Sequence, residues 1–216
     1  MTVSDRVPFY GRAAALHELV THTATVRATG QGRLLIVDGR RQVGKSRLLT
    51  EFVARARLPY LYYTTPTGSN PARHIEAWAG ESAHSTNPLP TADGLSVPPP
   101  RDWADVFARL AAACRNAPSV VVFDEFGAAV AAEPGLEVTL AAQWQRQLRT
   151  CPVLLVLISR GETSGPDPLA AHATTRHLEA LNPAECAHAL GSGATSMKAF
   201  VTRLVTGGYP RLVAGC

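Results

Sequence analysis

Short apolar runs alternate along the chain with segments whose apolar residues recur at helical spacing. The runs cover 33–38, 59–64, 119–123 and 152–158, and the helical segments cover 45–56, 102–115 and 136–149. Continuous apolar runs of this length are typical of strands that are buried on both faces of a parallel sheet. Because strands and helices alternate, the pattern predicts an α/β fold with a doubly wound, mostly parallel sheet.

A proline-rich segment at 86–100 shows neither pattern. Its composition favours a surface loop with polyproline character. A plain insertion and a segment that docks a partner are both consistent with this composition.

Composition indicates one sizeable globular domain, because 46% of the 216 residues are hydrophobic and 18% are charged. The net charge is +4, but the arginines are scattered, which favours a solvated surface over a nucleic-acid groove. The four cysteines are far apart and show no metal-ligand spacing. No apolar run is long enough to cross a membrane, and the first twelve residues hold no signal core, so we expect a cytoplasmic protein without a membrane partner.

The first apolar run leads directly into the motif of a phosphate loop, Gly-x4-Gly-Lys-Ser, and a helical segment follows. Glycines let the backbone turn its N–H groups toward phosphates, and the start of a helix adds positive potential. Strand, loop and helix in this order are the context that the motif requires. The nine residues that we expect to contact a nucleotide are Gly39, Arg40, Arg41, Gln42, Val43, Gly44, Lys45, Ser46 and Arg47.

Two side chains of this loop have distinct predicted roles. Lys45 supplies a compact cation for the β- and γ-phosphates, and we expect it to be exposed in the loop. The hydroxyl of Ser46 is placed to ligate Mg²⁺. The predicted ligand is therefore a nucleoside triphosphate, ATP, together with Mg²⁺.

The third apolar run ends in two adjacent carboxylates, Asp124 and Glu125, which resemble a Walker B motif. We expect Asp124 to hold Mg²⁺, directly or through water, and Glu125 to orient and deprotonate the attacking water. Acidic residues after a strand also serve as helix caps, so that alternative stays open at this stage.

Ser159 and Arg160 follow the fourth apolar run. In P-loop proteins that have an extra strand between the two Walker strands, this position lies beside the γ-phosphate. Either residue is therefore a candidate for sensing that phosphate and for a part in catalysis. An arginine that simply faces water at a strand end is the alternative.

Four motifs occur in one order: Phe9-Tyr-Gly-Arg12, the phosphate loop, Phe123-Asp-Glu-Phe126 and Thr206-Gly-Gly-Tyr-Pro-Arg211. In this the chain resembles the archaeal-type ATPases of the signal-transducing (STAND) branch of AAA+ proteins, a family with bacterial members. The resemblance implies a P-loop core at 1–180, with the extra strand between the Walker A and Walker B strands. It also implies that 181–216 forms the first helices of a lid, with most of the lid and the winged helix lacking.

The resemblance further implies that Gly11, Arg12 and the segment around Pro210 close on the adenine and ribose. Two positions depart from the family pattern, because Ala13 stands where an acidic residue is usual and His172 where an arginine is common. Because of these departures, it stays open which residues contact the adenine and whether a partner supplies an arginine.

Three functions follow as hypotheses. The first is a slow Mg²⁺-dependent ATPase that acts as a nucleotide-controlled switch on a protein partner or on a second copy of itself. The second is an ATP-dependent module associated with nucleic acid, for which DNA binding stays open. The third is an ATP-binding scaffold with negligible turnover.

Overall fold

The computed structural model describes residues 9–68, 70–82, 85–159, 168–191 and 193–215. Within these residues, five parallel strands form one sheet in the order β2-β3-β4-β1-β5. The strands are β1 (Arg33–Asp38), β2 (Tyr60–Thr64), β3 (Ser119–Asp124), β4 (Val153–Ile158) and β5 (Ala173–His177). The predicted α/β fold is confirmed, including the strand β4 between β1 and β3.

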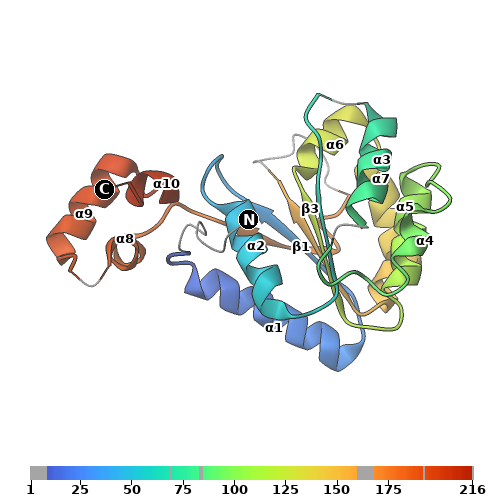
Figure 1. Cartoon of the computed structure of the whole chain (residues 1–216), viewed down its shortest axis with the longest axis horizontal. Coiled ribbons are helices and arrows are strands. Elements are labelled where there is room, and N and C mark those ends of the chain that lie inside the picture. Colours follow the sequence, from blue (N-terminus) through green and yellow to red (C-terminus); the bar gives the residue numbers. More distant parts are fainter. Residues whose placement is uncertain (1–8, 69, 83–84, 160–167, 192, 216) are drawn as a thin grey trace.

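Helices cover both faces of this sheet (Figure 1). They are α1 (Ala13–Thr29), α2 (Lys45–Ala56), α3 (Pro71–Ser82), α4 (Asp93–Ser96), α5 (Trp103–Ala113), α6 (Phe126–Ala132), α7 (Leu136–Arg146) and a short 3₁₀ helix, η1 (Leu148–Thr150). The alternation of side chains along the strands explains why helices pack on both faces of the sheet. Because successive side chains of a strand point to opposite faces, each of the strands β1 to β4 contributes to two separate cores.

Helices α1 and α2 pack on one face, against residues that include Val120, Val122 and Val156. Helices α3, α5, α6 and α7 pack on the other face, against residues that include Val121 and Phe123. The centre of the sheet is therefore buried on both sides, as its apolar runs predict.

The C-terminal helices α8 (Pro183–Leu190), α9 (Ser196–Thr206) and α10 (Pro210–Val213) lie together at one end of the molecule (Figure 1). They share a small core formed by Leu181, Cys186 and Val213. Helix α9 packs inward through Ala199, Thr202 and Thr206. Its large apolar side chains are exposed, namely Met197, Phe200, Val201, Leu204 and Val205.

The proline-rich segment is more ordered than a plain surface loop. It contains helix α4, and Leu89 and Leu95 are buried in the hydrophobic core to which α3 and α5 also contribute. The carbonyl of Asn87 accepts a hydrogen bond from the N–H of Tyr60. These anchors tie the segment to the edge strand β2, so the expectation of a simple surface loop is wrong for these residues.

None of the helices in the described part of the chain combines the length and apolar character that a membrane span requires.

Candidate functional site

The phosphate-loop motif forms the turn between β1 and α2, at the carboxyl end of the sheet. Gly39 and Gly44 have φ values of 135° and 101°, which favour glycine. A Cβ at Gly39 would also collide with the carbonyl oxygen of Leu178, in the segment after β5. The buried side chain of Val43 anchors the loop in the core of α1 and α2. The sequence thus folds here into the cradle that the motif predicts.

Lys45 is the first residue of α2, and only 7% of it is exposed. Its ammonium group donates hydrogen bonds to the carbonyls of Gly39 and Arg40. The expected exposure of Lys45 is wrong, because the loop wraps around its side chain. The charge is nevertheless held inside the loop, where phosphates are expected to bind.

Asp124 is the last residue of β3, and both of its carboxylate oxygens accept hydrogen bonds. Oδ1 accepts from the backbone N–H of Glu125 at 2.8 Å, and Oδ2 accepts from the hydroxyl of Tyr62 at 3.0 Å. Burial and the neighbouring carboxylate raise the pKa of Tyr62, so its hydroxyl stays protonated and donates. The Asp124 carboxylate is therefore buried and oriented.

Glu125 occupies the N-cap position of α6 with a φ of 57°. Its side chain makes no capping hydrogen bond to that helix. The geometry therefore disfavours the helix-cap alternative for Glu125. A left-handed conformation is strained for a residue with a Cβ, and such strain is concentrated at functional sites.

Ser159 follows β4, and its N–H donates to the carbonyl of Val37 in β1. It thus lies at the carboxyl edge of the sheet, between the phosphate-loop strand and the strand that ends in Asp124. Its role toward a γ-phosphate stays a prediction. Arg160 lies outside the described residues.

One cleft of about 560 Å³ collects the predicted site residues from distant parts of the chain. From the phosphate loop it is lined by Arg41, Gln42, Gly44, Lys45, Ser46 and Arg47. Asp124 and Glu125 line it from β3, and Arg12 and Pro210 line it from the two ends of the chain. Gly11, Gly39, Arg40, Val43 and Ser159 are not in this lining. The structure therefore brings ten of the predicted residues onto one surface.

Arg12 connects the phosphate loop with the C-terminal helices. Its Nη2 donates to the carbonyl of Val43 at 2.9 Å, and its backbone N–H donates to Oε1 of Glu185 at 2.8 Å. Burial lowers the pKa of Arg12 from its ordinary value. Its Nε is buried without a hydrogen-bond partner among the described residues. An unsatisfied donor in a cleft fits a site that receives an anionic or polar ligand.

Pro210 begins helix α10 directly above the phosphate loop. Its Cγ lies 3.5 Å from the position that a Cβ on Gly44 would occupy. The carbonyl of Gly208 accepts a hydrogen bond from the N–H of Leu181 at 2.8 Å. The segment is thus fixed over the loop, while its contact with an adenine stays a prediction.

The oxygen donors at the cleft fit Mg²⁺. Ser46 and Asp124 offer a hydroxyl and a carboxylate, which are hard ligands of the kind that this ion prefers. Among the described residues there is no cluster of three or more His, Cys, Asp or Glu side chains that would hold a metal ion. Mg²⁺ at nucleotide sites takes one or two protein ligands and completes its shell with phosphates and water.

The sequence analysis did not predict several residues that line or support the cleft. Phe9 and Tyr10 line the cleft, and the guanidinium groups of Arg47 and Arg55 lie 5.6 and 5.8 Å from the centre of the Phe9 ring. The one sequence signal for Phe9 and Tyr10 is their position directly before Gly11. Tyr62 and Glu185 gave no such signal, because they reach the site through tertiary contacts.

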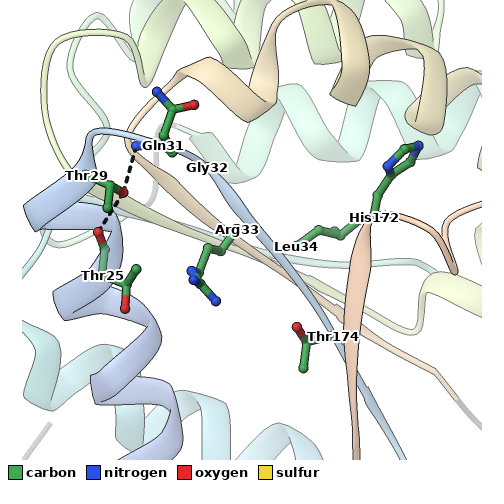
Figure 2. Close-up of a pocket in the computed structure, with 8 residues that line it drawn as sticks. All are labelled: Thr25, Thr29, Gln31, Gly32, Arg33, Leu34, His172 and Thr174. Carbon is green, nitrogen blue, oxygen red and sulfur yellow. Dashed lines mark hydrogen bonds between the residues drawn. The ribbon is translucent and has the colours of Figure 1, made fainter.

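A second hollow, of about 300 Å³, lies at the opposite end of the strands. Figure 2 shows it between the last turns of α1, the start of β1 and the start of β5, with Thr25, Arg33 and Thr174 around it. Ligands of open α/β sheets bind at the carboxyl ends of the strands. This hollow is at the amino ends and holds none of the predicted site residues.

Comparison with known proteins supports the fold. No protein-family model and no curated protein matches the chain. A STAND protein with a tetratricopeptide repeat sensor from Pyrococcus horikoshii matches with a TM-score of 0.56 and 14% identity, over 97% of this chain and 30% of that protein. The Orc1 protein of Aeropyrum pernix, solved in complex with DNA, matches with a TM-score of 0.55 and 20% identity, over 85% of this chain and 50% of that one.

The chain shares the α/β fold of these two structures. It spans at most half the length of these two structures. The likeness therefore concerns the fold of one part of each protein rather than the whole proteins.

Proposed function

We propose that the chain binds ATP with Mg²⁺ in the 560 Å³ cleft and hydrolyses it slowly, as a nucleotide-controlled switch. The observation that carries this proposal is the convergence of Lys45, Ser46, Asp124 and Glu125 with residues from both chain ends on one cleft. The fold shared with ATPases supports it.

Each of these side chains has a defined part in the proposed reaction. Lys45 neutralises charge on the β- and γ-phosphates, and Ser46 and Asp124 hold Mg²⁺, which supplies further charge neutralisation when bound. Glu125 accepts a proton from water as the water oxygen attacks the γ-phosphorus. The bond from that phosphorus to the β-phosphate oxygen breaks, and ADP and phosphate leave.

The proposed switch rests on the contacts by which the C-terminal helices border the cleft. The described contacts include the Arg12–Glu185 hydrogen bond and the packing of Pro210 on Gly44. A nucleotide in the cleft would add contacts to both parts. A twentyfold preference of the nucleotide for the closed arrangement corresponds to about 1.8 kcal/mol.

A phosphate-release assay tests the proposed hydrolysis. We expect Glu125→Gln to retain binding of a fluorescent ATP analogue and to lose turnover by roughly 100-fold, as for the loss of a catalytic base. Glu76→Gln, at an exposed position of α3, is the matched control and should keep wild-type turnover. If wild type binds the analogue without releasing phosphate, the scaffold hypothesis replaces the ATPase.

A role with nucleic acid is the second candidate, favoured by the similarity to a protein solved in complex with DNA and by the net charge of +4. The same assay with added duplex DNA separates the candidates. Stimulation that disappears at high salt supports this candidate. Unchanged turnover and no DNA binding support the switch.

A further inference from the structure

Tyr62 lies in the middle of β2, beside β3 and on the face of the sheet that α2 covers. In the register of the two strands it is opposite Val122, two residues before Asp124. Its long side chain spans that offset, so that the hydroxyl reaches Asp124 Oδ2 at 3.0 Å. The same hydroxyl lies 3.4 Å from the carbonyl oxygen of Ser46. Tyr62 therefore stands between the two residues that offer ligands to Mg²⁺.

The hydrogen bond from Tyr62 is the second of two that hold the Asp124 carboxylate in one orientation. The Glu125 N–H holds Oδ1 of Asp124 from one side, and the Tyr62 hydroxyl holds Oδ2 from the other. With one contact alone, the carboxylate would be free to rotate about its Cβ–Cγ bond. Hydrogen bonds to charged groups are stronger than those between neutral groups, so each contact restricts the rotation effectively.

We propose that Tyr62 is a positioning residue, which orients the Asp124 carboxylate toward Ser46 for the Mg²⁺ that accompanies ATP. The proposal rests on the proposed function, because it assigns Asp124 and Ser46 to that ion. Partners that orient metal ligands typically contribute 10- to 100-fold in metal affinity or activity. A purely structural tyrosine would support the edge strand β2 without affecting the response to the metal.

The test compares two tyrosines of one strand. Tyr62→Phe removes only the hydroxyl that contacts Asp124, and its ring can keep the packing on α2. Tyr60→Phe is the matched control, because Tyr60 lies on the same face two residues earlier and its hydroxyl contacts Thr86 Oγ1 at 2.9 Å. Thermal unfolding of both variants checks that they are folded.

Two readouts are measured on wild type and both variants. The first is the Mg²⁺ concentration that gives half-maximal ATP hydrolysis, and the second is Mn²⁺ binding to the ADP complex by electron paramagnetic resonance, which is independent of turnover. We expect Tyr62→Phe to need about tenfold more metal in both readouts, with unchanged affinity for ADP in the absence of metal. Tyr60→Phe should match wild type.

A double-variant cycle shows whether Tyr62 acts through Asp124. When Asp124→Asn is already present, adding Tyr62→Phe should change Mn²⁺ binding no further, because the carboxylate that Tyr62 orients is gone. Full additivity of the two losses overturns the proposal, and so does wild-type metal dependence of a folded Tyr62→Phe. An equal loss of ADP affinity without metal also overturns it, since that outcome shows a structural role. If wild type itself shows no metal-dependent nucleotide binding, the proposed function fails first.

Discussion

The backbone N–H of Arg12 donates a hydrogen bond to Oε1 of Glu185 at 2.8 Å, across 173 positions of sequence. The other oxygen of Glu185 accepts from the N–H of Asn182 and completes the capping box of α8. The start of α1 and the start of α8 are thereby held by one carboxylate, and both border the cleft.

Glu185→Ala should therefore loosen the connection between the N-terminal segment and the C-terminal helices. We expect faster hydrogen exchange at the Arg12 amide in the nucleotide-free protein, and nucleotide affinity that falls by about fivefold, as for the net contribution of one typical hydrogen bond. Hydrogen exchange with mass spectrometry and a binding titration measure the two effects.

Asn182→Ala is the matched control for this carboxylate. It removes the side-chain cap that accepts from the Glu185 N–H but keeps the carboxylate near Arg12. It should lower helix stability by about 1 kcal/mol and leave the Arg12 amide protected. Equal exchange at Arg12 in both variants would show that the cap, rather than the connection to Arg12, protects this amide.

Gly39→Ala should disrupt the phosphate loop, because the added Cβ meets the Leu178 carbonyl and φ is 135°. We expect a loss of at least about 2 kcal/mol of unfolding free energy together with weakened ATP binding. Gly80→Ala in α3 is the contrasting change, because a Cβ there meets no atom of its described surroundings within 4 Å. It should raise stability by about 0.5–1 kcal/mol. Urea denaturation compares the two, and similar effects would contradict the role of Gly39.

The sequence predicted four of the strands, including the edge strand β2, but not the strand β5 at the other edge. The four apolar runs are buried strands or nearly so, whereas β5 is a largely exposed edge strand of sequence Ala-Thr-Thr-Arg-His. Such a strand carries no apolar run, and its pairing with β1 supplies the structure. Helix α1 was missed for a related reason, since Thr and His interrupt its apolar positions and only four of its residues are buried.

The candidate site was predictable to the extent that it is local. The phosphate loop and the Asp124–Glu125 pair are contiguous motifs, so residue type and spacing are enough to identify them. Tyr62 and Glu185 act across strand pairing and across the fold, and no local pattern marks them. The sequence predicted the place of Lys45 in the loop but not its burial, because burial depends on how the loop wraps around the side chain.

The buried cysteines should be unreactive in the folded protein. Burial raises the pKa of Cys114 to about 12, and it also raises the pKa of Cys151 and Cys186. At pH 8 these thiols remain protonated, and the thiolate is the reactive form. In a Cys216→Ser variant, Ellman's reagent should react slowly before denaturation and with all three thiols after it. Rapid reaction in the native state would contradict the burial of at least one of them.

The most direct test of the account is calorimetric titration of Mg²⁺-ATP into wild type, Lys45→Ala and Lys198→Ala. Lys198 is the only other lysine of the chain and lies exposed on α9, so its replacement controls for the loss of one positive charge. We expect one nucleotide per chain for wild type and Lys198→Ala, with affinity reduced at least about 100-fold in Lys45→Ala, as for lost charge-assisted contacts to phosphate. Circular dichroism checks that all three proteins are folded. Wild-type affinity in a folded Lys45→Ala, or no binding by wild type, would contradict the assignment of the cleft as a nucleotide site.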